Sequence, residues 1–297
     1  MNILIKNLSK VYPQNKMALN NITLNLSSGI YALFGANGAG KSTFMKILAG
    51  VLAPSSGEIF IDDKSISPFD DNYSSKVGYL PQETPIYPEF TAEEFLRYLA
   101  TVKGLTKSES IIQVSHALES VNLQEHAKKK LKNFSGGMKR RIGIAQLLLN
   151  NPDILIIDEP TAGLDPKERI HFRNLISAIA RDRIVLLSTH IVSDIGSIAK
   201  EIIMMENGCI LKQETPLKLL NEIRGYIWTL EVSDQEIAHY EKMYRIGTIT
   251  QSKSNLHTLR IISLSSPHPN AKIAEPELED LYLFHLDGRG GTYDSIN

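Results

Sequence analysis

A glycine-rich segment carries the clearest chemistry in this sequence. It runs Gly35-Ala36-Asn37-Gly38-Ala39-Gly40-Lys41-Ser42-Thr43 and fits the pattern G-x-x-x-x-G-K-S/T. Glycines let such a loop curl until its backbone amides point at phosphate oxygens, and the helix that follows adds its positive dipole end. Lys41 would supply charge to the β- and γ-phosphates, while the Ser42 hydroxyl would ligate Mg²⁺. The segment therefore predicts a triphosphate site.

Two carboxylates, Asp158 and Glu159, end the apolar run from Ile154 to Ile157. A buried parallel strand delivers such groups at its C-terminal end, which is where α/β sheets place ligand-binding residues. Asp158 would join the Mg²⁺ shell, and Glu159 would polarise the water that attacks the γ-phosphate. Because apolar strands that end in acids are common, this assignment depends on the phosphate loop earlier in the chain.

A second candidate anion site lies at Ser135, Gly136 and Gly137. Ser135 is a good N-cap for the apolar helix that follows, and the two glycines leave backbone amides exposed at its start. Taken by itself, this pattern is equally typical of an ordinary capped helix.

Basic residues are concentrated on both sides of this segment. They are Lys128, Lys129, Lys130, Lys132, Lys139, Arg140 and Arg141. A solvated helical surface is the simplest interpretation of such a run. The alternatives are attraction to anionic lipid headgroups or to nucleic acid.

The elements that would position these groups alternate between strands and helices. Apolar runs or alternation predict strands near residues 3–8, 22–26, 30–34, 154–157 and 184–187, and a hairpin over 202–211 around the turn 206–208. Helical spacing predicts a helix from Lys41 that ends near Gly50 and Pro54. Residues 90–150 are predicted to be helical, with a capping box at Thr91 and Glu94. Such alternation favours a largely parallel sheet with helices outside it.

The pattern changes near residue 220. Short strands are predicted at 226–232, 246–250 and 256–264, and a final helix at 277–286. We therefore expect one domain over residues 1–221, which carries the phosphate loop and the two carboxylates, and a small α+β appendage over residues 222–297, which would be regulatory or dimerising.

Composition excludes several classes of protein. The chain has 297 residues, a formal net charge of -1, 42% hydrophobic residues and a single cysteine, Cys209. An intrinsically disordered chain would be less apolar or more highly charged, and a general electrostatic nucleic-acid binder would carry a basic excess. One cysteine cannot form an internal disulfide, so a reducing compartment fits. No specific nucleic-acid partner is expected.

The N-terminal sequence and the apolar runs bear on location. No run approaches the roughly 18–20 apolar residues of a membrane-spanning helix, and the first residues lack the features of a signal peptide. The expected location is the cytoplasm.

The order of the motifs resembles that of the ATP-binding cassette (ABC) ATPases. After the phosphate loop come Leu80-Pro81-Gln82, the signature-like segment 134–138, and the strand that ends in Asp158 and Glu159. The segments 160–165 (PTAGLD) and 187–190 (LSTH) continue the likeness, which covers residues from about 1 to 215. The resemblance implies an α/β P-loop NTPase fold of the ABC ATPase type, with a mostly parallel core sheet, an N-terminal antiparallel β part and a helical subdomain at about 90–150.

The resemblance also implies roles for single residues, with ATP and Mg²⁺ as cofactors. Tyr12 would stack on adenine, unless it is only a packing residue. Gln82 would sense Mg²⁺ and the attacking water, and His190 would contact the γ-phosphate and hold Glu159. Asp165 would communicate across a dimer. In this family two cassettes sandwich two ATP molecules, so Ser135, Gly136 and Gly137 would face nucleotide bound by a second copy.

The branch of the family is predicted from smaller details. Phe134 and Met138 replace the leucine and glutamine of the common Leu-Ser-Gly-Gly-Gln signature, and the run Ser-Gly-Gly-Met-Lys-Arg-Arg resembles ABC-2-type exporters. Residues 276–283 (PELEDLYL) resemble the C-terminal segment of that branch. This implies a homodimeric exporter ATPase on the cytosolic face of the membrane, with a multi-span permease on a separate chain. A soluble ATP-driven switch and an importer ATPase are the alternatives.

Overall fold

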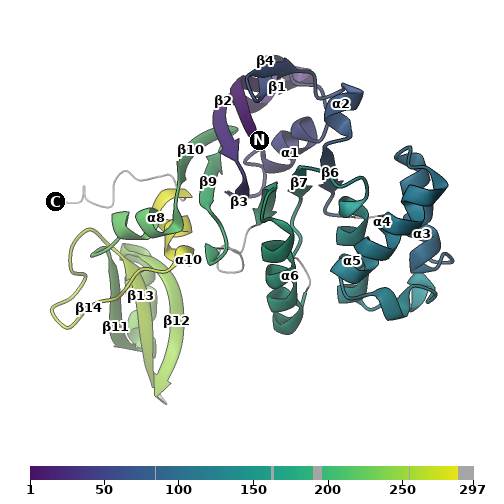
Figure 1. The fold of residues 1–297 in the computed structure, drawn as a ribbon. Helices are drawn as coiled ribbons and strands as arrows, with labels where there is room; N and C mark the ends of the chain where they lie inside the picture. Colours follow the sequence, from purple (N-terminus) through teal and green to yellow (C-terminus); the bar gives the residue numbers. More distant parts are fainter. Residues whose placement is uncertain (84, 162–163, 190–195, 254, 287–297) are drawn as a thin grey trace. The chain divides into compact units, whose positions relative to one another are not determined.

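The computed structural model describes residues 1–83, 85–161, 164–189, 196–253 and 255–286 (Figure 1). Contacts between residues divide the chain into two compact units. The first comprises Met1–His190 and Ser197–Gln213, and the second comprises Ile191–Gly196 and Glu214–Asn297. This division falls earlier than the predicted boundary after residue 221. The reason is helix α8 (Pro216–Glu222), which contacts α10 (Leu278–Leu281) within the second unit.

The N-terminal part of the first unit is an antiparallel sheet with the strand order β2-β1-β4-β5. Its strands are β1 (Asn2–Tyr12), β2 (Lys16–Ser27), β4 (Ser56–Ile61) and β5 (Lys64–Ile66). Alternate side chains of β2 are buried, as the apolar alternation predicts for a sheet with one face on the core.

A six-stranded sheet forms the centre of the first unit, in the order β10-β9-β3-β8-β7-β6. The strands are β3 (Gly29–Phe34), β6 (Val77–Leu80), β7 (Ile154–Ile157), β8 (Ile184–Thr189), β9 (Glu201–Glu206) and β10 (Cys209–Glu214). The five strands from β9 to β6 are parallel. Both faces of β7 and β8 are buried, which explains their continuous apolar runs. The predicted mostly parallel sheet is confirmed.

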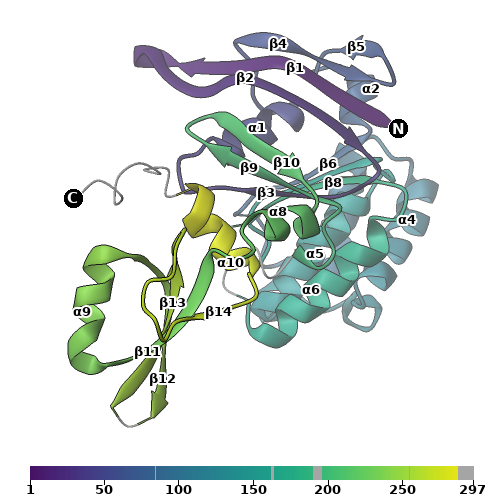
Figure 2. The same cartoon turned by 90° about the vertical axis from the view of Figure 1, so that its left-hand side faces the viewer.

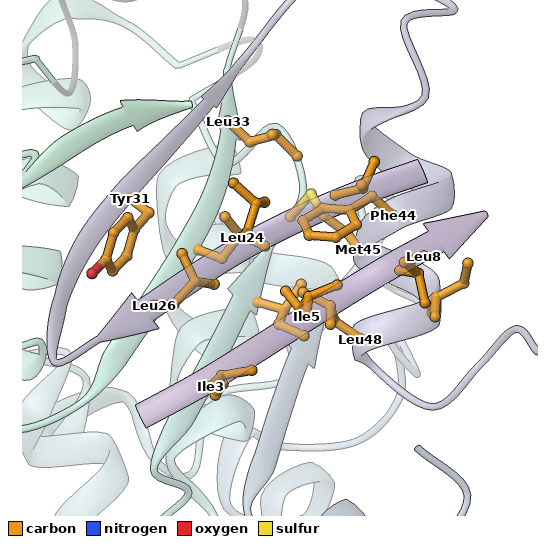
Figure 3. Packing of buried hydrophobic residues seen from close by; sticks show 14 of the residues in the cluster. Ile3, Ile5, Leu8, Leu24, Leu26, Tyr31, Leu33, Phe44, Met45 and Leu48 are labelled. Carbon is orange, nitrogen blue, oxygen red and sulfur yellow. The ribbon is translucent and has the colours of Figure 1, made fainter. Parts of the chain in front are cut away.

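Helix α1 (Lys41–Leu48) lies between the two sheets (Figures 1 and 2). Phe44 and Met45 are fully buried, and they pack with apolar residues of β1, β2 and β3 in one cluster (Figure 3). Full burial of a side chain of this size contributes about 2–3 kcal/mol. The helix that follows the phosphate loop is therefore anchored on both sides.

The remaining helices of the first unit are α2 (Asp71–Ser74), α3 (Ala92–Val102), α4 (Lys107–Ser120), α5 (Gly136–Leu148) and α6 (Pro166–Ile179). The predicted capping box is present, because Glu94 N donates to Thr91 Oγ1 and Thr91 N donates to Glu94 Oε2. Residues 90–150 are less uniformly helical than predicted, since only single turns at Gln124–His126 (η2) and Leu131–Asn133 (η3) lie between α4 and α5. Helix α6 lies on the side of the central sheet opposite α1 (Figure 2).

The second unit is built around a sheet with the order β12-β13-β11-β14. Its elements are α8, β11 (Ile227–Ser233), α9 (Asp234–Met243), β12 (Arg245–Lys253), β13 (Leu256–Ile262), β14 (Lys272–Ile273), α10 and a final turn, η4 (Tyr282–Leu286). The three predicted strands are present. Helix α9 is absent from the sequence prediction, although Ser233 and Glu236 form a capping box at its start that indicates it.

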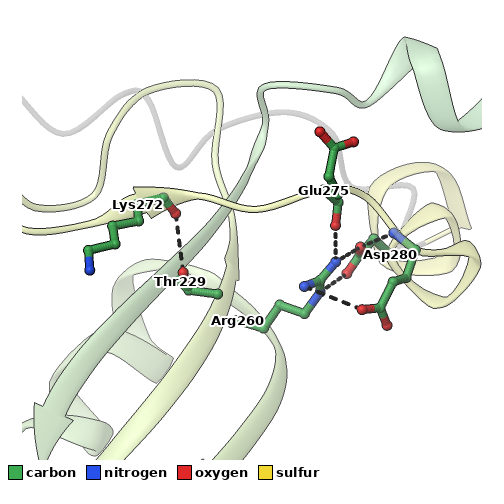
Figure 4. Close-up of polar contacts among 6 residues, drawn as sticks. Thr229, Arg260, Lys272, Glu275 and Asp280 are labelled. Carbon is green, nitrogen blue, oxygen red and sulfur yellow. Dashed lines mark hydrogen bonds and ion pairs between the residues drawn. The ribbon is translucent and has the colours of Figure 1, made fainter.

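A buried ion pair joins α10 to β13 in this unit (Figure 4). Arg260 donates from Nε and Nη2 to the two carboxylate oxygens of Asp280, at 2.9 and 2.6 Å. The side chain of Asp280 is 2% exposed and also accepts from Glu277 N at 2.7 Å. These bonds raise the pKa of Arg260 above its usual value. The pair therefore fastens the C-terminal helical segment to the sheet.

Replacing Asp280 with Asn is expected to destabilise the second unit by about 3–5 kcal/mol, because it breaks one side of a buried pair and leaves Arg260 without its buried carboxylate partner. The chain has one tryptophan, Trp228 in β11, so urea unfolding followed by its fluorescence reports this unit. Glu277→Gln is the matched control: that side chain is 65% exposed and 3.6 Å from Arg260, and its loss should change stability by less than about 0.5 kcal/mol. Equal effects of the two variants would contradict the assigned role of the buried pair.

Candidate functional site

The site is a pocket of about 510 Å³ in the first unit. Residues that line it come from the β1–β2 region, the phosphate loop with the start of α1, and the ends of β6 and β7. They are Tyr12, Lys16, Met17, Ala18, Asn37, Gly38, Gly40, Lys41, Ser42, Thr43, Gln82 and Glu159. The structure thus brings seven of the predicted phosphate-loop and adenine residues together with two predicted catalytic residues. Gly35, Ala36 and Ala39 belong to the loop but do not line the pocket.

The phosphate loop needs glycine for its backbone path. Gly38 and Gly40 have φ values of +86° and +105°, in the left-handed region that glycine adopts without strain. A Cβ on Gly40 would lie 2.6 Å from the backbone oxygen of Ala18. The loop therefore turns tightly against β2, and α1 begins directly after it.

Lys41 is buried at the base of the loop, with 5% of its surface exposed. Its Nζ donates to the backbone oxygens of Gly35 at 2.6 Å and Ala36 at 3.0 Å. Burial lowers its pKa, and the charges of Glu159 and Asp158 oppose that shift. The ammonium group is thus held beside the loop, where an incoming phosphate would offer it anionic oxygens in place of carbonyls.

The two carboxylates at the end of β7 have different environments. Asp158 is 4% exposed, and its Oδ1 accepts from Ser188 Oγ at 2.5 Å. Glu159 has a φ of +44°, a left-handed conformation that costs a non-glycine residue about 1 kcal/mol or more. Its backbone N donates to the same Ser188 Oγ at 2.8 Å. One buried hydroxyl therefore fixes both acidic residues.

Gln82 follows β6 and reaches the same carboxylate. Its Nε2 donates to Glu159 Oε2 at 3.3 Å, although 77 residues separate the two in the chain.

Tyr12 lies at the end of β1, where its hydroxyl is 3.4 Å from Thr43 Oγ1 and its ring is 5.5 Å from Lys10 Nζ. A half-buried ring on the pocket wall is suitably placed to contact a base.

The predicted magnesium ligands form a plausible donor set. Ser42 and Gln82 line the pocket, and Asp158 lies at the end of the neighbouring strand. Hydroxyl, amide and carboxylate oxygens are hard donors of the kind that Mg²⁺ prefers, and Mg²⁺ often takes only one or two carboxylates together with substrate phosphates. Among the described residues, no group of three or more His, Cys, Asp or Glu side chains could hold a metal ion.

The signature segment lies at the start of α5 and, among the described residues, contributes nothing to the pocket wall. Ser135 is the N-cap predicted from the sequence, since its Oγ accepts from Met138 N at 3.2 Å. The two unusual residues, Phe134 and Met138, are 5% and 9% exposed. Their side chains therefore pack inside the unit, which is why apolar residues are tolerated there.

The basic residues near the signature do not form one solvated surface. Lys130 and Lys132 are about half exposed and pair with Glu89. Arg140, in contrast, is turned inward: burial lowers its pKa, and the charges of Asp158 and Glu159 oppose the shift. The interpretation as a solvated face is therefore wrong for Arg140.

Two residues of the site were not identified as functional candidates from the sequence. Ser188 interrupts an otherwise apolar strand and is fully buried, which is the signal that would have indicated it. Arg140 gave no such signal. Of the other predicted residues, Asp165 caps α6, where its Oδ1 accepts from Glu168 N at 2.8 Å, and His190 lies outside the described residues.

The helices of the described part of the chain were compared with the length and hydropathy of membrane spans. None of them is long and apolar enough to cross a membrane.

Comparisons with known proteins agree with the geometry. The ABC transporter family model matches residues 19–162. The linearmycin resistance ATP-binding protein LnrL of Bacillus subtilis is 30% identical, over 96% of this chain and 97% of that protein. The bacitracin transport ATP-binding protein BcrA of Bacillus licheniformis is 35% identical, over 80% of this chain and 78% of that protein. The solved post-hydrolysis dimer of the ATP-binding cassette MJ0796 with ADP and phosphate has a TM-score of 0.64 at 27% identity, over 72% of this chain and 98% of that one. This chain therefore belongs to the ABC transporter family, as one of its ATP-binding ATPases.

Proposed function

We propose that this chain is the ATP-hydrolysing subunit of an ABC-2-type exporter and that it acts as a homodimer on a separate multi-span membrane chain. The observation that carries the proposal is the convergence of Lys41, Gln82 and Glu159 on one pocket. The names of LnrL and BcrA, which refer to antibiotic resistance and transport, favour the exporter branch. The transported compound would contact the membrane chain rather than this one.

Nucleotide would occupy the pocket with its phosphates against the loop 35–43 and its base against Tyr12. Lys41 would bind the β- and γ-phosphates. Ser42, Gln82 and Asp158 would hold Mg²⁺, which neutralises charge on the phosphates when it is bound. This assignment is supported by the donor set of oxygen atoms and by the burial of Lys41 between the loop and the two carboxylates.

Hydrolysis would require Glu159 to orient and polarise a water molecule beside the γ-phosphate. Gln82 Nε2 lies 3.3 Å from Glu159 Oε2. It would either keep its hydrogen bond to that carboxylate or donate to the attacking water instead. His190 is assigned to the γ-phosphate by the family resemblance alone. A carboxylate in this position acts as a general base and typically contributes a factor of about 10²–10⁴ to the rate.

Two copies would be needed to enclose each nucleotide. The signature residues at the start of helix α5, Ser135, Gly136 and Gly137, do not line the pocket that holds the phosphate loop. Their exposed helix N-terminus would bind the γ-phosphate held by the second copy. Asp165, at the start of α6, would contact the same dimer interface.

An aromatic patch that follows Gln82 in the chain would receive the membrane chain. Tyr87, Phe90 and Tyr98 form a cluster with ring centroids 5.3–6.1 Å apart. Tyr87 and Tyr98 are 48% and 45% exposed. Exposed aromatic clusters are typical of protein interfaces. The patch follows Gln82 closely in the chain, so movement there would pass to the nucleotide site.

The patch supplies the test of this function. Tagged chain should co-purify a multi-span membrane protein from mildly solubilised membranes, and Tyr87→Ala with Tyr98→Ala should lower the recovery at least about tenfold, since interface hot spots contribute about 2 kcal/mol or more. Val102→Ala on the same helix is the matched control, because this residue is 67% exposed but outside the cluster. Recovery of ribosomes or DNA instead would overturn the transport proposal.

A further inference from the structure

We infer that Arg140 is a positioning residue for ATP hydrolysis: it holds the backbone at Glu159 and Gln82 and ties both to the first turn of α5. The inference rests on the proposed roles of Glu159 and Gln82. It goes beyond them because Arg140 would contact neither nucleotide nor water. It would act through the residues that do.

The guanidinium of Arg140 binds three backbone carbonyls from two separate loops. Its Nε donates to Pro160 O at 2.6 Å and its Nη1 donates to Gln82 O at 3.2 Å. Its Nη2 donates to Glu159 O. The planar fork of an arginine presents its donors in a fixed geometry, so one side chain can set the relative positions of all three acceptors.

The backbone of Glu159 needs such support. Its left-handed conformation, with a φ of +44°, persists only where neighbouring groups hold it. Ser188 Oγ accepts from its N at 2.8 Å, and Arg140 binds its carbonyl oxygen. One hydrogen bond therefore holds the backbone N–H of Glu159, and the other holds its carbonyl group. Loss of Arg140 would let this backbone relax, and the Glu159 carboxylate would move away from the γ-phosphate.

The same side chain connects this site to the signature segment. Arg140 lies one turn into α5, which begins at Gly136, and Lys139 N donates to Ser135 O at 2.9 Å. Met138 is buried beside it, so this turn is packed on the unit rather than free to rotate alone. When the signature segment binds the nucleotide held by the second copy, it would shift. That shift would therefore move the guanidinium group of Arg140. Arg140 would make hydrolysis in one site sensitive to occupation of the other.

The test uses Arg140→Lys and Arg140→Gln in the 297-residue chain, with Lys139→Gln as the matched control. Lys139 is exposed, lies on the same turn and carries the same charge. A lysine keeps the charge of Arg140 but cannot reach three carbonyls. Both Arg140 variants should lower kcat about 10- to 50-fold, while the KM for ATP and the Kd of a fluorescent ATP analogue change less than about threefold. The control should keep kcat within about twofold.

A double-mutant cycle with Glu159→Gln separates positioning from general damage. If Arg140 acts through Glu159, the loss caused by Arg140→Gln should almost vanish in single-turnover assays of the Glu159→Gln background. Full additivity of the two losses would overturn the inference. So would a kcat near wild type in both Arg140 variants, or a parallel loss of ATP binding and thermal stability in both.

The same assays distinguish this inference from the proposed function. Normal turnover by Glu159→Gln alone would reject the hydrolytic role proposed for Glu159. Loss of turnover in Glu159→Gln together with normal turnover in both Arg140 variants would reject only the role of Arg140. Should Arg140→Gln fail to fold, Arg140→Lys carries the test, because its charge and stem are retained.

Discussion

Glu159→Gln should bind ATP with nearly normal affinity and lose at least about 100-fold in kcat, which is the lower range expected for removal of a general base. The amide has the shape of the carboxylate, and an amide oxygen can still accept the 3.3 Å hydrogen bond from Gln82 Nε2. It cannot take a proton from water. With ATP bound and not cleaved, two copies should remain closed around the nucleotide.

The measurements are steady-state hydrolysis, binding of a fluorescent ATP analogue, and size-exclusion chromatography with ATP and Mg²⁺. A dimer that persists in the variant and dissociates in the wild type is the expected result. Glu93→Gln is a suitable control, since Glu93 is a surface residue paired with Arg97 at 2.6 Å. Turnover within about threefold of wild type in Glu159→Gln would remove Glu159 from the proposed mechanism.

Lys41→Ala should weaken ATP binding itself, by about 10- to 100-fold, and turnover should fall with it. A hydrogen bond to a charged group contributes about 1.5–3 kcal/mol, and each 1.4 kcal/mol is a factor of ten in affinity. Lys41 is 5% exposed and sits between the loop carbonyls and the two carboxylates. Its loss would also remove one of the positive charges that face those carboxylates, so they would repel the triphosphate more strongly.

The readout is the Kd of a fluorescent ATP analogue measured by titration. Lys41→Met keeps the apolar stem of the side chain and separates the loss of charge from collapse of the loop. Lys46→Ala, which removes an exposed lysine from the last turn of the same helix, is the control. Wild-type affinity in both Lys41 variants would show that this charge does not bind the phosphates.

Much of the fold could be predicted because its signals are local. Continuous apolar runs indicated β3, β7 and β8, and each of these strands is covered on both faces. The Asn207-Gly208 turn between β9 and β10 has the positive φ values of a tight hairpin, 48° and 79°. The domain boundary after residue 221 stays a prediction, and the contact-based division falls after Gln213 instead. Helix α8 has no sequence signal that assigns it to one unit, since that choice depends on its contact with α10 about 60 residues later.

The signature region shows the same limit at the scale of side chains. Seven charged residues close in sequence favour a solvated surface, and spacing alone cannot distinguish Lys139 from Arg140. The fold separates them because helix α5 presents Lys139 to solvent and directs Arg140 at the ends of β6 and β7. Packing therefore decides which of these charged side chains becomes part of the site.

The sequence by itself determined the chemistry available to this protein: a phosphate loop, two carboxylates at the end of an apolar strand, and the motif order of an ABC ATPase. Within each motif the residues lie close together in the chain, so local spacing is sufficient to detect the motif. The tertiary structure alone decided which distant groups meet. Gln82, Arg140, Glu159 and Ser188 come together because parallel strands end at one edge of the sheet and α5 packs against it. Their hydrogen bonds span 19 to 77 residues of chain, and no local pattern records such a contact.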